Sequence, residues 1–129
     1  MIDRLIQEHK ELDPKLNQIG RVCDDNPQDA VRLLLGMRTK ILRHAIEEEA
    51  RIMRVIMKDA KSESAESVRI MQEHRWVSEF LERRIDKLSR VPSNESRVEI
   101  RKFLSDLRQH FKEEEQVVFP LALKALASE

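Results

Sequence analysis

The sequence of 129 residues lacks the features of a β-rich or disulfide-stabilised protein. It has only two glycines and no tyrosine, and so few glycines argue against a fold that needs many tight turns. The one cysteine, Cys23, cannot form an internal disulfide, and at a predicted helix end we expect an inert thiol. The first ten residues carry several charges, unlike a signal peptide, so we expect a cytoplasmic protein.

The charge balance and the short apolar runs exclude two further classes. Lysine plus arginine and aspartate plus glutamate each total 24, so the net charge is zero and a strongly basic nucleic-acid binder is excluded. The longest apolar runs are only a few residues, far below the ~20 needed to span a bilayer. We therefore expect neither nucleic acid nor membrane as a partner, and the sequence leaves a homodimer open.

What the sequence does contain is typical of long helices. Glutamate, lysine, arginine and leucine are abundant, and turn signals occur at 24–27, 61–64 and 91–94. Asn26 before Pro27 predicts an N-cap with proline at the first helical position, and Ser93 or Asn94 is expected to cap a later helix in the same way. The predicted helices cover about 1–23, 27–60, 63–91 and 94–127. Their short connections favour an all-α, up-down-up-down antiparallel four-helix bundle.

Each segment has a stripe of apolar residues at alternating steps of three and four, as expected for a face directed into a bundle. The four stripes comprise Ile2, Leu5, His9, Leu12, Leu16 and Ile19; Leu34, Met37, Ile41, His44, Glu48, Ile52 and Val55; Met71, His74, Ser78, Leu81, Ile85 and Leu88; and Phe103, Leu107, His110, Glu114, Val117 and Leu121. Two prolines interrupt this pattern. Pro14 predicts a kink in the first helix, and Pro120 predicts a bend or restart in the last.

All four histidines of the chain, and two glutamates, occupy these stripes. Glu48 and Glu114 each follow a histidine by four residues and therefore lie on the same helix face as that histidine. Burying two carboxylates and four imidazoles is unfavourable unless they are compensated, and no lysine or arginine lies on the stripes at that level. The alternatives are a network of His–Glu hydrogen bonds and a bound cation.

We favour the cation, because imidazole nitrogen and carboxylate oxygen are ligands that suit iron, manganese and zinc. Two ions fit the set better than one, with two terminal histidines each and both glutamates bridging. The expected cofactor is two iron ions, with manganese or zinc as alternatives. The metal-binding residues that we predict are His9, His44, Glu48, His74, His110 and Glu114. The adjacent Glu47, Glu49, Glu113 and Glu115 are expected to be solvated or to pair between helices, with accessory ligation as the alternative.

The chain also repeats itself. Gln7-Glu8-His9 matches Gln72-Glu73-His74, and His44 with Glu47-Glu48-Glu49 matches His110 with Glu113-Glu114-Glu115. The matching positions are 65 and 66 residues apart, about half of the chain. We therefore expect one domain over 1–129 that is built from two helical hairpins, about 1–62 and 63–129, with two facing ligand sets.

The doubled pattern of a histidine followed by His-x3-Glu resembles the hemerythrin-like family of HHE cation-binding domains over nearly the whole chain. The stretch from His110 to Leu121, in which glutamates precede Phe119-Pro120, is similar to the end of the family's repeat. The resemblance implies a four-helix bundle with a non-haem di-iron site. It also implies that the four histidines are terminal ligands and that Glu48 and Glu114 bridge.

Two departures bear on function. Oxygen-carrying members have a further histidine where this chain has Ser78, and an aspartate where it has Glu114. The four-His, two-Glu set is instead similar to the di-iron domain of the repair-of-iron-centres proteins. Ser78 is expected to leave space beside the metal or to hold a water there as an outer group. Trp76 lies off the stripe, so we expect it to serve packing or an interface.

The function that we expect is a non-haem di-iron protein that binds or reacts with O2, NO or peroxide, in oxidative or nitrosative stress. Open coordination positions at each iron would admit such a small diatomic or peroxide ligand. The alternative is iron sensing, storage or donation without turnover, so the sequence leaves open whether the chain is an enzyme. No nucleophile–base pair, phosphate loop or nucleotide fingerprint appears in the chain.

Overall fold

The chain forms a bundle of four long helical rods, shown by a computed structural model that describes residues 2–53, 64–88 and 90–127. Several rods contain a short π-helical turn, labelled η below. The elements are α1 Ile2–Asp25, α2 Pro27–Glu48, η1 Glu49–Met53, α4 Ser64–Glu79, η3 Phe80–Arg84, α5 Ile85–Leu88, α6 Ser93–Glu113, η4 Glu114–Val118 and α7 Phe119–Ala127.

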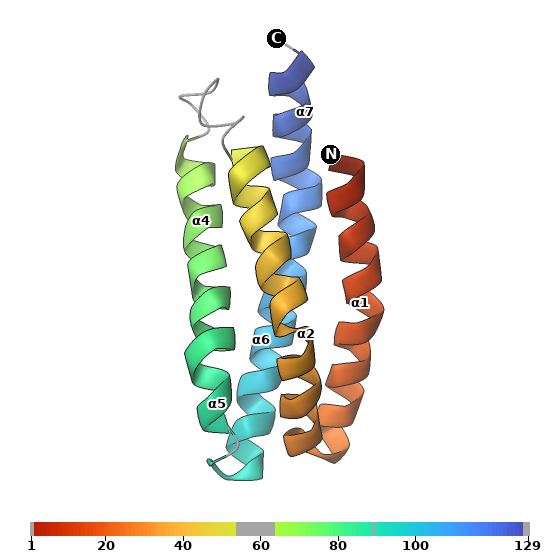
Figure 1. Ribbon diagram of the computed structural model, residues 1–129, viewed down its shortest axis with the longest axis vertical. Coiled ribbons are helices and arrows are strands. Elements are labelled where there is room, and N and C mark those ends of the chain that lie inside the picture. The colour runs from red at the N-terminus through yellow and green to blue at the C-terminus, as the bar shows by residue number, and fades with distance from the viewer. Residues whose placement is uncertain (1, 54–63, 89, 128–129) are drawn as a thin grey trace.

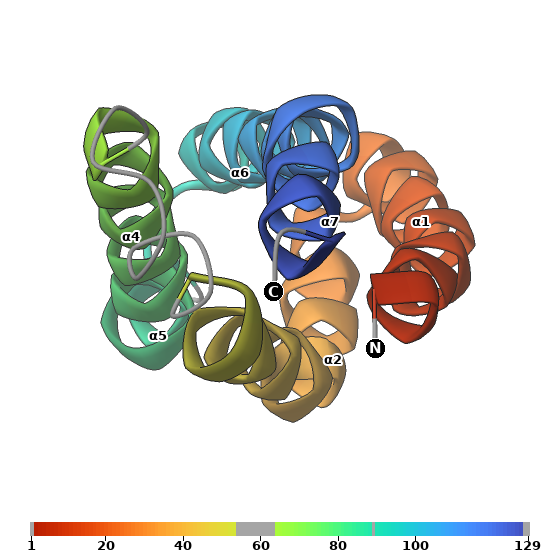
Figure 2. The ribbon, with the colours of Figure 1, turned by 90° about the horizontal axis from the view of Figure 1, so that it is seen from above.

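The rods are arranged as a ring in which each rod is antiparallel to the next one along the chain (Figures 1 and 2). Seen from above, α7 leans from the end of α6 toward the middle of the ring (Figure 2). The predicted all-α four-helix bundle is confirmed. Within the described ranges, none of the helices combines the length and the apolar character needed to cross a membrane.

The helix starts show one correct prediction and one error. Asn26 caps α2, because its side-chain oxygen accepts hydrogen bonds from the backbone N–H groups of Gln28 and Asp29, with Pro27 in the first turn. The prediction that Ser93 or Asn94 caps α6 is wrong. Pro92 occupies the cap position and α6 begins at Ser93. The carbonyl of Pro92, whose ring fixes an extended approach to the helix, accepts the first helical hydrogen bonds. The signal at 61–63 lies outside the described residues.

Two separate apolar cores fill the bundle. The larger contains Leu16, Leu34, Leu81, Phe103 and other fully buried residues from all four rods. The smaller lies at the end of the bundle that holds the N-terminus, where α1 meets η4 and α7; its buried members are Ile2, Leu5, Val118, Phe119 and Ala122. Along α1 and along the rod from α6 to α7, the predicted ligands fall between these two groups, so apolar side chains flank the ligands on both sides there.

The π-turn η4 changes which residues face inward. In it the N–H of Phe119 donates to the carbonyl of Glu114, five residues earlier, so the turn is wider than an α-turn. Val118 is therefore 1% exposed and Val117 is 38% exposed, which corrects the predicted position of Val117 on the inward stripe. The helix continues into α7 through Pro120 after this wide turn rather than breaking there.

Two further predictions concern single residues. The predicted inward position of Met71 is wrong, because its side chain is 39% exposed; the buried residues of α4 that are described start at His74. Pro14 lies inside α1, and the helix continues past it to Asp25. The kink at Pro14 stays a prediction.

The shifted register predicts different effects for two adjacent valines. Val118→Ala should lower the free energy of unfolding by about 2 kcal/mol, because it removes buried methyl groups and leaves a cavity. Val117→Ala, the same change one residue earlier, should alter it by less than about 0.5 kcal/mol. Urea unfolding of both variants checks this. Equal losses would contradict the inward rotation of Val118.

Candidate metal centre

The two glutamates and four histidines predicted as ligands meet in one buried layer of the bundle. They are provided by α1, α2, α4, α6 and the first residue of η4, and each is at most 5% exposed. We call them the His–Glu cluster: His9, His44, Glu48, His74, His110 and Glu114. All four histidines direct Nε2 toward the glutamates.

Glu48 lies among three of the histidines. Its Oε1 is 3.4 Å from Nε2 of His9 and forms an ion pair with His44 on its own helix. Its Oε2 is 3.4 Å from Nε2 of His74. The carboxylate of Glu48 therefore joins histidines from both halves of the chain.

Glu114 is placed in the corresponding way. Its Oε1 is 3.1 Å from Nε2 of His110, on the same helical rod, and 3.5 Å from Nε2 of His9. Its Oε2 is 3.7 Å from Nε2 of His74. The two glutamates are thus the shared members of the cluster, while the histidines divide between two ends.

The arrangement contains two groups of four ligand atoms that have the spacing of a metal site. His9 and His44 form one group with both glutamates, and His74 and His110 form the other with the same two glutamates. Within each group the ligand atoms lie within 4.8 Å of one another. Two adjacent cation sites with common carboxylates are what this geometry can provide.

The cluster also contains buried polar atoms without hydrogen-bond partners. Both carboxylate oxygens of Glu114 and Oε2 of Glu48 lack a partner, as does Nε2 of His110. Among the described residues, Glu48 and Glu114 form ion pairs with histidines and with no lysine or arginine. Unpaired buried oxygens of this kind are costly, and a bound cation is the partner that would satisfy them.

Electrostatics at Glu48 and His74 favour their charged forms. Burial raises the pKa of Glu48, but its close contacts with His44, His74 and His9 outweigh this, and its pKa lies well below its usual range. Burial lowers the pKa of His74, yet contacts with Glu48 and Glu49 leave that pKa above its ordinary value. The centre is therefore suited to hold carboxylates ionised.

A second set of carboxylates faces the outer nitrogens of the histidines. Nδ1 of His9 is 3.0 Å from Glu115, and Nδ1 of His74 is 3.1 Å from Glu49. The other two pairs are Nδ1 of His44 with Glu8, at 3.6 Å, and Nδ1 of His110 with Glu73. Because an ionised carboxylate can only accept, Nδ1–H of His9, His74 and His110 donates to it, and Nε2 of these histidines is left to face the centre. Nδ1 of His44 lies too far from Glu8 for a hydrogen bond.

Arg4 and Arg69 form ion pairs with glutamates on the outer side of this network. Arg4 lies 3.3 Å from Glu47 and 4.0 Å from Glu8, and Arg69 lies 3.6 Å from Glu113 and 4.0 Å from Glu73. The sequence repeat is thus also a repeat of contacts. Glu47 and Glu113 pair between helices as predicted, whereas Glu49 and Glu115 contact ligand histidines.

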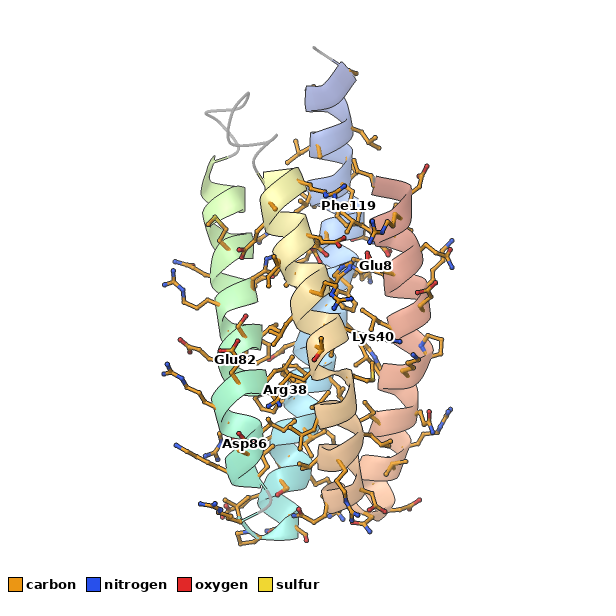
Figure 3. All side chains as sticks on the ribbon, in the orientation of Figure 1. Glu8, Arg38, Lys40, Glu82, Asp86 and Phe119 are labelled. Atoms are coloured by element: carbon orange, nitrogen blue, oxygen red, sulfur yellow. The ribbon has the colours of Figure 1, made fainter. Side chains whose placement is uncertain are left out.

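Two phenylalanines pack against His9. Its ring stacks on that of Phe111, with centroids 4.1 Å apart, and lies 5.6 Å from that of Phe119. Figure 3 shows Phe119 and Glu8 in the same half of the bundle. These rings restrict the orientation of the His9 imidazole.

Ser78 is only partly buried, whereas Val77 before it is 2% exposed and packs in the larger core. The inward face of α4 therefore runs from His74 through Val77. The outer role suggested for Ser78 stays a prediction.

In the described part of the chain, two cavities reach the outer edges of the cluster, one between α4 and α6 and the other between α1 and the rod of α6 and η4. One, of about 410 Å³, is lined by His110 and Glu73 together with Trp76. The other, of about 380 Å³, is lined by His9, Glu115 and Phe111. Both touch a ligand histidine and the carboxylate that contacts its Nδ1.

The comparison with known families agrees with this geometry. Residues 1–122 match the model of the hemerythrin HHE cation-binding domain. The chain belongs to this family. No curated protein and no solved structure gave a match. The family and the buried ligand atoms together indicate a hemerythrin-like site for a metal cation; the ligand role of each residue stays a prediction.

Sequence reasoning missed the roles of Glu8 and Glu73 in this hemerythrin-like site. Their signal was present in the repeated Gln-Glu-His triplets, since each glutamate precedes a ligand histidine. Each contacts the histidine of the neighbouring helix rather than the one beside it in the sequence. That pairing depends on how the helices are aligned in the bundle.

The outer carboxylates give a matched test. Glu73→Ala removes the acceptor at Nδ1 of His110 and should weaken metal affinity roughly 10- to 100-fold. Asp106→Ala removes a carboxylate that lines the same cavity but pairs with Lys102, and affinity should stay within about twofold of the parent, as expected for a surface ion pair. Competition with a metal chelator measures both. Equal losses would contradict a role for Glu73 in orienting His110.

Proposed function

We propose that this hemerythrin-like chain is a non-haem di-iron protein of the cytoplasm that binds or reacts with O2, NO or peroxide, in a response to oxidative or nitrosative stress. The observation that carries the proposal is the pair of four-atom ligand groups that share Glu48 and Glu114. A set of imidazole nitrogens and carboxylate oxygens suits iron, although it also accepts manganese or zinc.

When bound, an iron pair would supply open coordination positions and electrons for small ligands. The protein supplies the surroundings. Two histidines and two carboxylates at each position are too few to complete a six-coordinate iron, which leaves space for an exogenous ligand. Phe111 and Phe119 pack on the ring of His9, and the apolar cores limit the entry of water along the bundle.

The routes from the surface to the metal centre suit small ligands. The cavities beside His9 and His110 extend from the protein surface to the imidazoles. The side chains of the His–Glu cluster are at most 5% exposed, so a bulky organic substrate would have to displace protein to reach their ligand atoms. A diatomic molecule or peroxide is therefore the substrate class that the site favours.

The test uses protein loaded anaerobically with ferrous iron and mixed with O2, NO or hydrogen peroxide in a stopped-flow spectrometer. A rapid change in the optical spectrum is expected with at least one of the three. Glu48→Ala should abolish it, because that carboxylate belongs to both ligand groups. Glu47→Ala, the adjacent residue that contacts Arg4, should retain it.

The opposite outcome would support the alternative function. If the spectrum did not change and the iron passed readily to a chelator, storage, sensing or donation would explain the site instead. A spectral change that persisted in Glu48→Ala would show that the reacting iron is not held at the His–Glu cluster.

A further inference from the structure

A further cavity, of about 430 Å³, lies outside the metal centre, between the α4–η3–α5 rod and α6. Its floor is aromatic, formed by Trp76, Phe80 and Phe103, and its rim is charged. We call it the aromatic groove. It contains no residue of the His–Glu cluster, and its volume falls in the range of roughly 300–1,000 Å³ typical of small-molecule sites.

The three rings of the aromatic groove pack against one another. Phe80 and Phe103 are stacked, with centroids 4.1 Å apart and planes at 12°. The Trp76 ring is tilted by 34° to that of Phe103, with centroids 5.4 Å apart, and its side chain is 37% exposed, whereas both phenylalanines are buried. Trp76 therefore offers exposed aromatic surface beside the groove, and planar aromatic groups pack well on such surface.

The rim is rich in cations in a chain whose net charge is zero. Arg84 forms two hydrogen bonds with Glu99, at 2.7 and 2.6 Å, and Lys102 pairs with Asp106 at 3.0 Å. Arg83 and Lys87 are exposed and form no ion pair within the described part of the chain. Their positive charges therefore lie beside the aromatic floor, and no described residue neutralises them. Arginine is well suited to bind a phosphate.

The backbone adds an independent observation. The π-turn η3 places Phe80, Arg83 and Arg84 along the groove. The π-turns η1 and η4 begin at or next to Glu48 and Glu114, so the metal centre accounts for them. The turn η3 begins six residues after His74 and has no such explanation. Isolated π-turns are rare and often occur at functional sites.

We propose that the aromatic groove binds a small planar aromatic molecule that carries a phosphate group. The ring stacks on Trp76 and the phosphate binds Arg83 and Lys87. Because none of these residues belongs to the His–Glu cluster, binding does not require a metal. It is expected in both apo and metal-loaded protein, so the test is independent of the proposed iron chemistry.

Flavin mononucleotide is a suitable probe, since it joins a flat three-ring system to a phosphate. Isothermal titration calorimetry of the full chain, with and without metal, should give saturable binding with one site. Trp76 is the only tryptophan and there is no tyrosine, so in metal-free protein the intrinsic fluorescence reports binding beside Trp76 and should be quenched. Because Trp76 also lines the cavity beside His110, the variants of Arg83 and Lys87, which line the groove and not that cavity, assign the quenching to the groove. Riboflavin, which lacks the phosphate, should bind with a Kd at least about tenfold higher than that of flavin mononucleotide.

A double variant, Arg83→Ala with Lys87→Ala, should weaken flavin mononucleotide binding about tenfold or more. Both side chains are exposed, so the fold should be retained, which circular dichroism checks. Arg75→Ala is the matched control: it removes an exposed arginine of α4 that does not line the groove, and the Kd should stay within about twofold.

Three of the results that would overturn the proposal concern flavin mononucleotide binding. These are the absence of saturable binding, equal Kd values for riboflavin and flavin mononucleotide, and equal losses in the double variant and in Arg75→Ala. Inorganic phosphate binding as tightly as flavin mononucleotide would also overturn it, because the aromatic floor would then contribute nothing.

Discussion

The burial of six ionisable side chains in one layer of an apolar bundle is the constraint on which the rest of this structure depends. Two carboxylates and four imidazoles are almost completely removed from water, and three of the carboxylate oxygens have no hydrogen-bond donor. Leaving such groups uncompensated costs several kcal/mol per ion. A bound cation reverses that balance, so metal binding and folding should stabilise each other.

The surroundings of the layer follow from this constraint. Apolar cores flank the cluster along α1 and along the rod from α6 to α7, and the π-turns η1 and η4 begin next to Glu48 and at Glu114. Each histidine has a carboxylate at its outer nitrogen, and Arg4 and Arg69 balance these acids near the surface. The two halves of the chain repeat the same contacts, which is why two equivalent metal positions are proposed rather than one.

The sequence predicted the bundle and the members of the buried cluster because steps of three and four residues mark the inward face of a helix. It placed Val117 on that face wrongly, since a π-turn depends on backbone hydrogen bonds that residue spacing does not reveal. It also missed Glu8 and Glu73, whose contacts are with histidines on neighbouring helices. Such pairings need the relative alignment of the helices, which no local pattern contains.

The metal content of the purified protein tests the central claim most directly. The chain should be purified anaerobically from iron-supplied cells, its metals quantified by mass spectrometry and its concentration determined by amino-acid analysis. Two metal ions per chain, mostly iron, are predicted, because two ligand groups share both glutamates. A ratio near one in fully loaded protein, or no retained metal, would contradict the dinuclear centre.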